Sequence, residues 1–286
     1  MPAVACIIGA MNVAEETLQA LARALAGRSA PRVHALHLPP ARWNGSKHGE
    51  FGALELDDGS LGLSYMLLEG TLTALSAGGA GSGLAGTDAL DLARRWVHGS
   101  GAARTLGFAA VNALTRHLFD RAGFVPPDAS DSIGGLDPRV GEHVGMVGFF
   151  PPLVKEVTAC GAHLTVLELR PELAGAHAGF RVTLDPRDLR TCDKVLSTST
   201  VLLNDTLDAV LSHCAQARAF ALIGPGASCL PDALFRRGVT LLGGVWIEHG
   251  NALKRALTAG EPWGRYARKF ALPAPQWHAR WPAGLA

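Results

Sequence analysis

The sequence lacks the features that would place it in several large classes of protein. Its formal net charge is only +1, so no excess of one sign predicts binding to nucleic acid or to an acidic membrane surface. Charged residues make up 18% of the chain and apolar residues 48%, which excludes a disordered, solvated chain. No apolar run is long enough to cross a bilayer, so we expect neither a membrane span nor a membrane partner.

Cysteine and lysine are both scarce. The five cysteines are scattered without a Cys-x-x-Cys pair, and no basic leader precedes Glu15 and Glu16. We therefore expect reduced thiols, no targeting segment and a cytoplasmic protein. The five lysines leave few amines for imine chemistry. The 286 residues suffice for one large or two modest domains with a sizeable core.

The clearest structural signal lies in the middle of the chain. Residues 143–148 form a short apolar block with glycines, which is typical of a buried parallel strand. Pro151 then begins a helix that ends at Gly161. Residues 163–168 form a second buried strand, which ends on Glu168. We predict a strand–turn–helix–strand unit with parallel strands and a right-handed crossover.

This unit places the turn after its first strand at the carboxyl edge of the sheet, where open α/β sheets bind ligands. Free N–H groups and the dipole at the helix start favour an anion or a polar ligand edge there. Glu168 follows Gly148 by about twenty residues, near the spacing of a Rossmann acid that meets a ribose hydroxyl. Phe149, Phe150 and two prolines stand where the Gly-x-Gly-x-x-Gly loop needs small residues. Another ligand is therefore favoured over NAD, and a purely structural turn with a solvated carboxylate is the third interpretation.

The front half, residues 1–125, is predicted to be a small α+β domain. Apolar periodicity predicts helices and strands in the following order: a helix over 12–26, a strand over 33–38, a hairpin over 51–68 and helices over 88–97 and 103–119. Asn112 lies within the apolar run of the last helix and needs hydrogen-bond partners. The polar loop with Trp43, Asn44 and Lys47 either faces a ligand or is a surface turn with a packed tryptophan.

The rear half, residues 126–286, begins after a cluster of proline, glycine and aspartate that marks a linker. Beyond the central unit, we expect strands over 180–184, 194–198, 220–223 and 240–247, and helices over 205–217, 231–237 and 251–259. Strands that alternate with helices predict an α/β fold with a Rossmann-like, doubly wound, mostly parallel sheet.

Hydroxyl, amide and glycine residues follow the strands of the rear half and form the candidate ligand site. They are Gly148, Pro151, Glu168, Thr198, Ser199, Thr200, Asn204, Gly224, Pro225 and Ser228, with Trp43, Asn44 and Lys47 closing over them. Converging neutral donors and acceptors suit a polar small molecule. No nucleophile–base pair stands out, because Ser228 lacks the Gly-x-Ser-x-Gly elbow and Cys229 is better explained as a packed thiol.

The eleven histidines do not form an evident metal site. His34 and His37 are three residues apart in a predicted strand, so their side chains point to opposite faces. His213 and Cys214 are adjacent on a predicted helix and also diverge. A metal site would have to be assembled from residues in separate loops, and the sequence alone does not show which loops lie together in space.

Three stretches of the rear half carry a family resemblance: Val144–Leu153, Ser197–Leu207 and Leu222–Pro231. Together with Arg104–Ala113 of the front half, they resemble the heavy-metal chelation domain family. The resemblance implies a Rossmann-like rear domain, an enolase-N-terminal-like front domain and a link to metal uptake or corrinoid formation. By position it points to Gly148, Pro151, Thr198, Thr200, Asn204, Gly224 and Pro225. Gly226 stands where the family tends to have a hydroxyl residue, which argues against chelation by this chain's own side chains.

We therefore expect a cytoplasmic, metal-related protein that binds a metal, a metal chelate or its small-molecule precursor between the two domains. The first candidate cofactor is a transition or heavy metal. The alternative is an enzyme that uses a nucleotide-like cofactor against Glu168 and the helix start at Pro151. A non-catalytic interaction subunit is the third hypothesis. The expected partner is a small molecule or metal, not nucleic acid or membrane, and a homodimer is left open.

Overall fold

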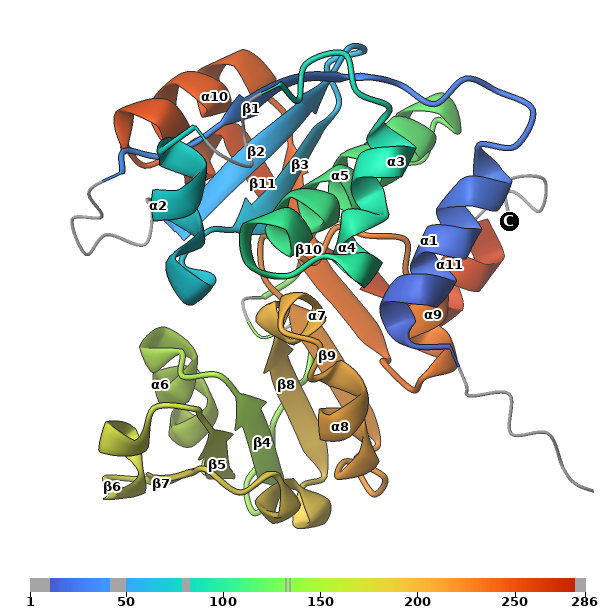
Figure 1. The fold of residues 1–286 in the computed structure, drawn as a ribbon. Coiled ribbons are helices and arrows are strands. Elements are labelled where there is room, and N and C mark those ends of the chain that lie inside the picture. Colours follow the sequence, from blue (N-terminus) through green and yellow to red (C-terminus); the bar gives the residue numbers. More distant parts are fainter. Residues whose placement is uncertain (1–10, 42–49, 79–82, 132, 134, 281–286) are drawn as a thin grey trace, which may run out of the picture.

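The computed structural model describes residues 11–41, 50–78, 83–131, 133 and 135–280. The front half is built on a three-stranded antiparallel sheet in the order β1-β2-β3 (Figure 1). Its elements are α1 (Val13–Ala24), β1 (Val33–His37), β2 (Phe51–Leu56), β3 (Leu61–Tyr65), α2 (Thr71–Ser76), α3 (Ala89–Ala93), α4 (Arg95–His98) and α5 (Gly101–Arg121).

Local chemistry explains where these elements begin and turn. Asn12 caps α1 with a capping box, in which its side chain accepts from Glu15 N–H and the Glu15 carboxylate accepts from Asn12 N–H. Gly59 has a φ of +85° in the turn between β2 and β3, a conformation that glycine adopts without strain. The predicted first helix and the predicted hairpin are confirmed.

Helix α5 packs so closely against β3 and α4 that backbone atoms of the neighbouring elements come into contact. An ideal Cβ on Gly62 would lie 2.2 Å from both Ala109 O and Ala113 N. On the other side of the helix, a Cβ on Gly107 would lie 2.1 Å from Trp96 N. The glycine at each contact therefore lets α5 pack between the sheet and α4, where a side chain would force them apart.

The rear half is built on an eight-stranded sheet in the order β11-β10-β9-β8-β4-β5-β7-β6. Its elements are β4 (His143–Val147), α6 (Pro151–Ala159), β5 (His163–Leu167), β6 (Gly175–His177), β7 (Phe180–Thr183), β8 (Lys194–Thr198), α7 (Thr200–Leu203), α8 (Leu207–Ser212), β9 (Ala219–Ile223), α9 (Asp232–Arg236), β10 (Leu241–Ile247), α10 (Gly250–Ala259), β11 (Ala267–Pro273) and α11 (Ala274–Arg280). Neighbouring strands from β10 through to β7 are parallel, and only the edge strands β11 and β6 are antiparallel to their neighbours. The predicted two-domain α/β fold with a mostly parallel sheet is confirmed.

Two predictions for the rear half are wrong in detail. The helix expected over 205–217 is found as the shorter α8, and a separate short helix, α7, precedes it; Asp205, with a φ of +60°, lies between the two and keeps them apart. The edge strands β6 and β11 were not expected. The three residues of β6 are all exposed, so it carries no apolar alternation that a sequence could reveal.

The two halves share part of their cores. One face of the front sheet packs against α5, and the opposite face packs against α10 from the rear half of the sequence (Figure 1). Buried Glu55 in β2 joins them: its Oε1 lies 2.6 Å from Lys254 Nζ in α10, and its Oε2 lies 2.7 Å from His37 Nε2. The domain boundary at residue 125 stays a prediction. Among the described residues, no helix is long and apolar enough to cross a membrane.

Candidate functional site

The exits of the central strands converge at one edge of the rear sheet. β4 lies between β5 and β8, and the helices that follow β4 and β8 pack into separate cores on opposite faces. This is a topological switch point, the place where open α/β sheets form a crevice. Gly148 leaves β4 with a φ of +88°, and an ideal Cβ on it would lie 3.2 Å from Thr198 Cγ2. A Cβ on Gly224, after β9, would lie 2.5 Å from Ser199 Oγ. Four of the predicted site residues therefore lie side by side.

The hydroxyl residues after β8 hold their own turn together. Thr198 Oγ1 donates to Thr200 Oγ1 at 3.0 Å and accepts from Thr200 N–H at 3.2 Å. Ser199 N–H donates to Ile223 O at 2.7 Å, which ties the turn to β9. These hydroxyls lie where the sequence predicted them, and their hydrogen bonds fix the turn between β8 and α7.

Asn204 lies at the opposite end of α7 from this cluster. Its side chain shares a 2.7 Å hydrogen bond with Thr206 Oγ1 inside its own turn. The front half covers the same end of the helix: Trp96 Nε1 donates to Leu202 O at 2.9 Å, and Arg104 Nε donates to Leu203 O at 2.6 Å. Because these carbonyls end a helix and have no partner within it, the front half completes α7.

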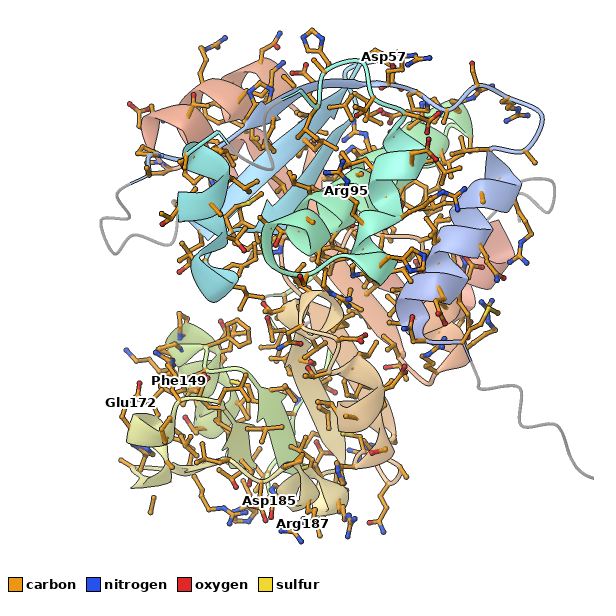
Figure 2. The ribbon with its side chains drawn as sticks, in the orientation of Figure 1. Asp57, Arg95, Phe149, Glu172, Asp185 and Arg187 are labelled. Atoms are coloured by element: carbon orange, nitrogen blue, oxygen red, sulfur yellow. The ribbon has the colours of Figure 1, made fainter. Side chains whose placement is uncertain are left out.

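Glu168 is committed to the turn after β4. Its Oε2 accepts from Phe149 N–H at 3.1 Å, and its Oε1 accepts from Leu169 N–H at 2.8 Å. Phe149, labelled in Figure 2, lies at the turn between β4 and α6. Both carboxylate oxygens thus bind backbone N–H groups, so the ribose role predicted for Glu168 would require these hydrogen bonds to be shared or broken.

The start of α6 offers few free donors. Pro151 and Pro152 occupy the first helical positions and have no N–H, while Leu153 N–H donates to Phe150 O at 2.9 Å. The expectation that free N–H groups here would attract an anion is not met. The two prolines have no N–H group, and the N–H of Leu153 already donates to a backbone carbonyl.

The larger cavity has a volume of about 300 Å³ and opens between α6, β9, β10 and β11. Gly224 and Pro225, both predicted site residues, line it. The rest of its wall is mostly apolar: Phe150, Pro152, Leu153, Ile223, Val245, Phe270 and Ala271. An ideal Cβ on Gly243 would approach Ile223 Cγ2 to 3.0 Å, so the absent side chain keeps this wall open. Cavities of this size are at the lower end of the range for small-molecule sites.

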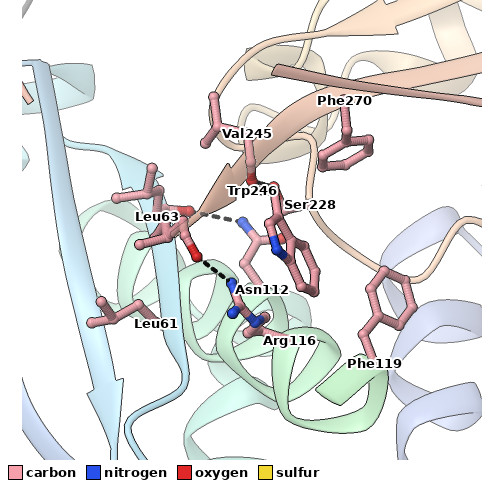
Figure 3. Close-up of a pocket in the computed structure, with 10 residues that line it drawn as sticks. Leu61, Leu63, Asn112, Arg116, Phe119, Ser228, Val245, Trp246 and Phe270 are labelled. Atoms are coloured by element: carbon pink, nitrogen blue, oxygen red, sulfur yellow. Dashed lines mark hydrogen bonds between the residues drawn. The ribbon is translucent and has the colours of Figure 1, made fainter. Parts of the chain in front are cut away.

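A second cavity, of about 20 Å³, lies between the two halves (Figure 3). Predicted site residue Ser228 lines it from the rear half. Asn112 of α5 lines it from the front half and is 1% exposed; its Nδ2 donates to Leu63 O at 2.8 Å and to Gly226 O at 3.1 Å. The predicted need of Asn112 for partners is confirmed for Nδ2, while Oδ1 has no partner among the described residues. This cavity has room for about one water molecule.

The three residues expected to close over the strand exits lie outside the described residues: Trp43, Asn44 and Lys47. Another front-half side chain, Tyr65 at the end of β3, comes within electrostatic reach of the β5 exit. Burial raises the pKa of Tyr65; the Glu50 and Glu168 carboxylates raise it further, and Arg170 lowers it.

Two family models match the chain. Residues 132–274 and residues 50–115 each match a family described as "putative heavy-metal chelation", and the first match spans half of the chain. The chain belongs to this family.

Relatives in the heavy-metal chelation family share the architecture described above. An uncharacterized protein of Methanocaldococcus jannaschii is 31% identical over 138 residues, 48% of this chain and 52% of that protein, so this chain spans about half of that relative's length. A family protein of unknown function from Pyrococcus horikoshii has a TM-score of 0.63 at 17% identity, over 92% of this chain and 98% of that one. One from Desulfitobacterium hafniense has a TM-score of 0.66 at 20% identity, over 91% and 98%. These structures show a shared fold.

The name of the heavy-metal chelation family implies a metal, and the side chains that the structure describes in this member do not fit one. In the described ranges, no three His, Cys, Asp or Glu residues come together in a way that could hold a metal ion. Burial raises the pKa of Cys192 to about 12, of Cys214 to about 11 and of Cys229 to about 12. Burial therefore disfavours, at these three positions, the thiolate form that ligates metals.

Most residues that line the larger cavity were not among the site residues predicted from the sequence. Gly243 is followed by Gly244 inside a strand, and such a pair signals close backbone approach or space left by absent side chains. Ala271 belongs to β11, a strand that was not expected. The glycine pair was a usable signal, whereas the contribution of β11 depended on a chain reversal that local sequence did not reveal.

Proposed function

We propose that this family member binds a small organic molecule in the cavity of about 300 Å³ at the strand exits. The ligand is a metal-chelating compound, its metal complex or its organic precursor. The size and the apolar walls of the cavity carry this proposal, because they suit an organic body better than a bare ion. The description of the family supports the link to a metal.

The donor set supports a ligand that brings its own metal-binding atoms. The described residues offer no group of His, Cys, Asp or Glu suited to a metal ion, and burial raises the pKa of the Cys192 and Cys229 thiols. A chelate whose organic part fills the apolar cavity needs no such group from the protein. These observations support a role in metal homeostasis or in the biosynthesis of a chelator or metallocofactor.

The cavity wall also favours binding over nucleophilic catalysis. The described residues that line it include glycine, proline, apolar and a few charged residues, without a serine, threonine, cysteine or histidine. Covalent catalysis by a hydroxyl or thiol requires one of these groups next to a base. The cavity thus has the composition of a binding site.

A calorimetric titration tests the proposal with defined probes. Nickel(II) and cobalt(II) chlorides would be titrated alone and as complexes of 2,2′-bipyridine, which supplies an apolar body. We expect the complexes to bind and the bare ions not to bind at one equivalent. Ala271→Phe, which enlarges a side chain of the cavity wall, should abolish binding, whereas the same change at exposed Ala159 on α6 should not. Stoichiometric binding of bare ions that Ala271→Phe leaves unchanged would contradict the proposal.

The alternative is an enzyme that uses a nucleotide-like cofactor, favoured by the position of Glu168 at the exit of β5. Native mass spectrometry of the purified protein would detect a copurified nucleotide. Glu168→Ala should lose it if the carboxylate binds the ribose, and retention would count against that role. The hydrogen bonds of Glu168 to two backbone N–H groups make this the second choice.

A further inference from the structure

The charged side chains that line the larger cavity differ in whether they already interact with other groups of the chain. Three of them line it: Asp131, Glu156 and Lys269. Lys269 is engaged within the chain. Asp131 uses Oδ1 to accept from Ile133 N–H at 3.0 Å and from Gly135 N–H at 2.8 Å. In the described part of the chain, the Glu156 carboxylate makes no hydrogen bond or ion pair. The cavity therefore carries two carboxylates and one ammonium group, which is itself occupied.

The helical spacing of α6 places Glu156 on the cavity side. It is four residues after Pro152 and three after Leu153, and both of these also line the cavity. Residues at these spacings share one face of a helix. The exposed Glu156 carboxylate consequently lies at the edge of an apolar wall, where it can meet the charge of a ligand whose body enters the cavity.

The start of α6 argues independently against an anionic ligand. A helix start usually attracts anions through its free N–H groups. Here Pro151 and Pro152 have no N–H, and Phe149 N–H donates to Glu168. An anionic ligand would meet carboxylates without the backbone donors that normally compensate for them.

We propose that the ligand of this cavity is cationic at its polar end, either an organic amine or a metal complex with net positive charge. Its apolar body contacts the wall formed by Ile223, Val245 and Phe270, and its positive charge faces Glu156 and Asp131. The inference rests on the proposed function, because it concerns the same cavity, and it adds the charge of the ligand.

Three indole probes of nearly equal size test the charge preference: tryptamine (cation), tryptophol (neutral) and indole-3-acetate (anion). Binding would be measured by ligand-detected NMR at low salt. An exposed pair is worth up to about 1 kcal/mol, so we expect tryptamine to bind about threefold to fivefold more tightly than tryptophol, and indole-3-acetate to bind most weakly. Salt at about 0.5 M should compress these differences, because it screens exposed charges.

Variants separate this inference from the proposed function. Glu156→Gln should remove most of the preference for tryptamine, and Glu156→Lys should reverse it. Glu172→Gln, an exposed carboxylate outside the cavity wall, is the matched control and should change nothing. Equal binding of the three probes that Ala271→Phe abolishes would overturn the charge inference and leave the proposed function standing.

Binding that survives occlusion of the cavity, or no binding at all, would overturn both proposals. Ala129→Phe, at a position of the cavity wall whose N–H donates to Lys269 O in β11, is a second occluding variant in case Ala271→Phe does not fold. Circular dichroism and the melting temperature of each variant show whether the fold is retained.

Discussion

Two cavities lined by described residues differ in how their walls use polar groups. The cavity of about 20 Å³ between the halves is bordered by Asn112, whose amide holds carbonyl groups from both halves. The cavity of about 300 Å³ at the strand exits has apolar walls, is widened by Gly243, and keeps the Glu156 carboxylate without a described partner. In the first wall the Asn112 amide N–H groups hold the two halves together, although Asn112 Oδ1 has no partner among the described residues, whereas the second wall leaves a carboxylate available to a ligand.

The two cavities also share a wall. Val245 and Phe270 line both, so the junction between the halves lies directly behind the proposed ligand site. The Asn112 hydrogen bond to Gly226 O reaches the loop that carries Gly224 and Pro225. The front half therefore helps to hold the strand exits in place, and substitutions at the junction should cost stability first and ligand affinity second.

The largest expected effect is at Trp96, which is fully buried where the front half meets α7. Trp96→Ala removes the contact with Phe108, whose ring centroid lies 5.0 Å away, and leaves Leu202 O without its donor. We expect the free energy of unfolding to fall by about 3–5 kcal/mol, measured by urea denaturation. Trp96→Phe keeps most of the packing and should lose only about 1–2 kcal/mol. Equal losses in the two variants would show that packing contributes little here.

A smaller loss is expected at Asn112. Asn112→Leu keeps the approximate size of the side chain but leaves Leu63 O and Gly226 O without a donor. We expect a loss of about 2–3 kcal/mol in unfolding free energy, because buried carbonyl groups without partners are costly. The same change at exposed Asn251 is the matched control and should stay within about 0.5 kcal/mol. A loss of similar size at both positions would remove Asn112 from its role at the junction.

The elements of the fold followed from the sequence wherever a strong local pattern existed. The unit from β4 to β5 was predictable, because buried parallel strands are short apolar runs and proline and glycine mark the helix between them. The packing of α10 on the front sheet was not predictable, because it depends on a contact between segments about two hundred residues apart. Nothing in the helix itself specifies which sheet it covers.

Part of the candidate site was predictable because its residues follow strands that the sequence identifies. Gly148, Thr198, Ser199 and Gly224 lie together because parallel strands bring their carboxyl ends to one edge. Asn204 lies one helical turn further along, where its N–H donates to Thr200 O and its amide is used in its own turn, so its part in the site stays a prediction. Local hydrogen bonds of this kind depend on backbone angles that the residue names alone do not give.

A carboxylate that stabilises the fold should make the free energy of unfolding depend on pH. Burial works to raise the pKa of Asp58, but hydrogen bonds from His117 and Ser60 outweigh it and lower the pKa from 3.8 to about 2. The resulting stability is present above the unfolded pKa and is lost as pH falls through the folded one. Because the side chain is 37% exposed, solvent screening limits the effect of Asp58→Asn to about 1 kcal/mol at pH 7. The difference from wild type should vanish between about pH 4 and pH 2, and Asp57→Asn is the neighbouring control.

The smallest effect on stability is expected for the carboxylate assigned to the ligand. Glu156→Gln makes the same acid-to-amide change as Asp58→Asn, but Glu156 is exposed and, within the described chain, has no hydrogen bond to lose. We expect its unfolding free energy to stay within about 0.5 kcal/mol of wild type at every pH from 4 to 8. If this substitution instead costs as much as Asp58→Asn, then Glu156 stabilises the fold, and the contrast between a cavity wall that joins the two halves and a cavity wall that offers a carboxylate to a ligand fails.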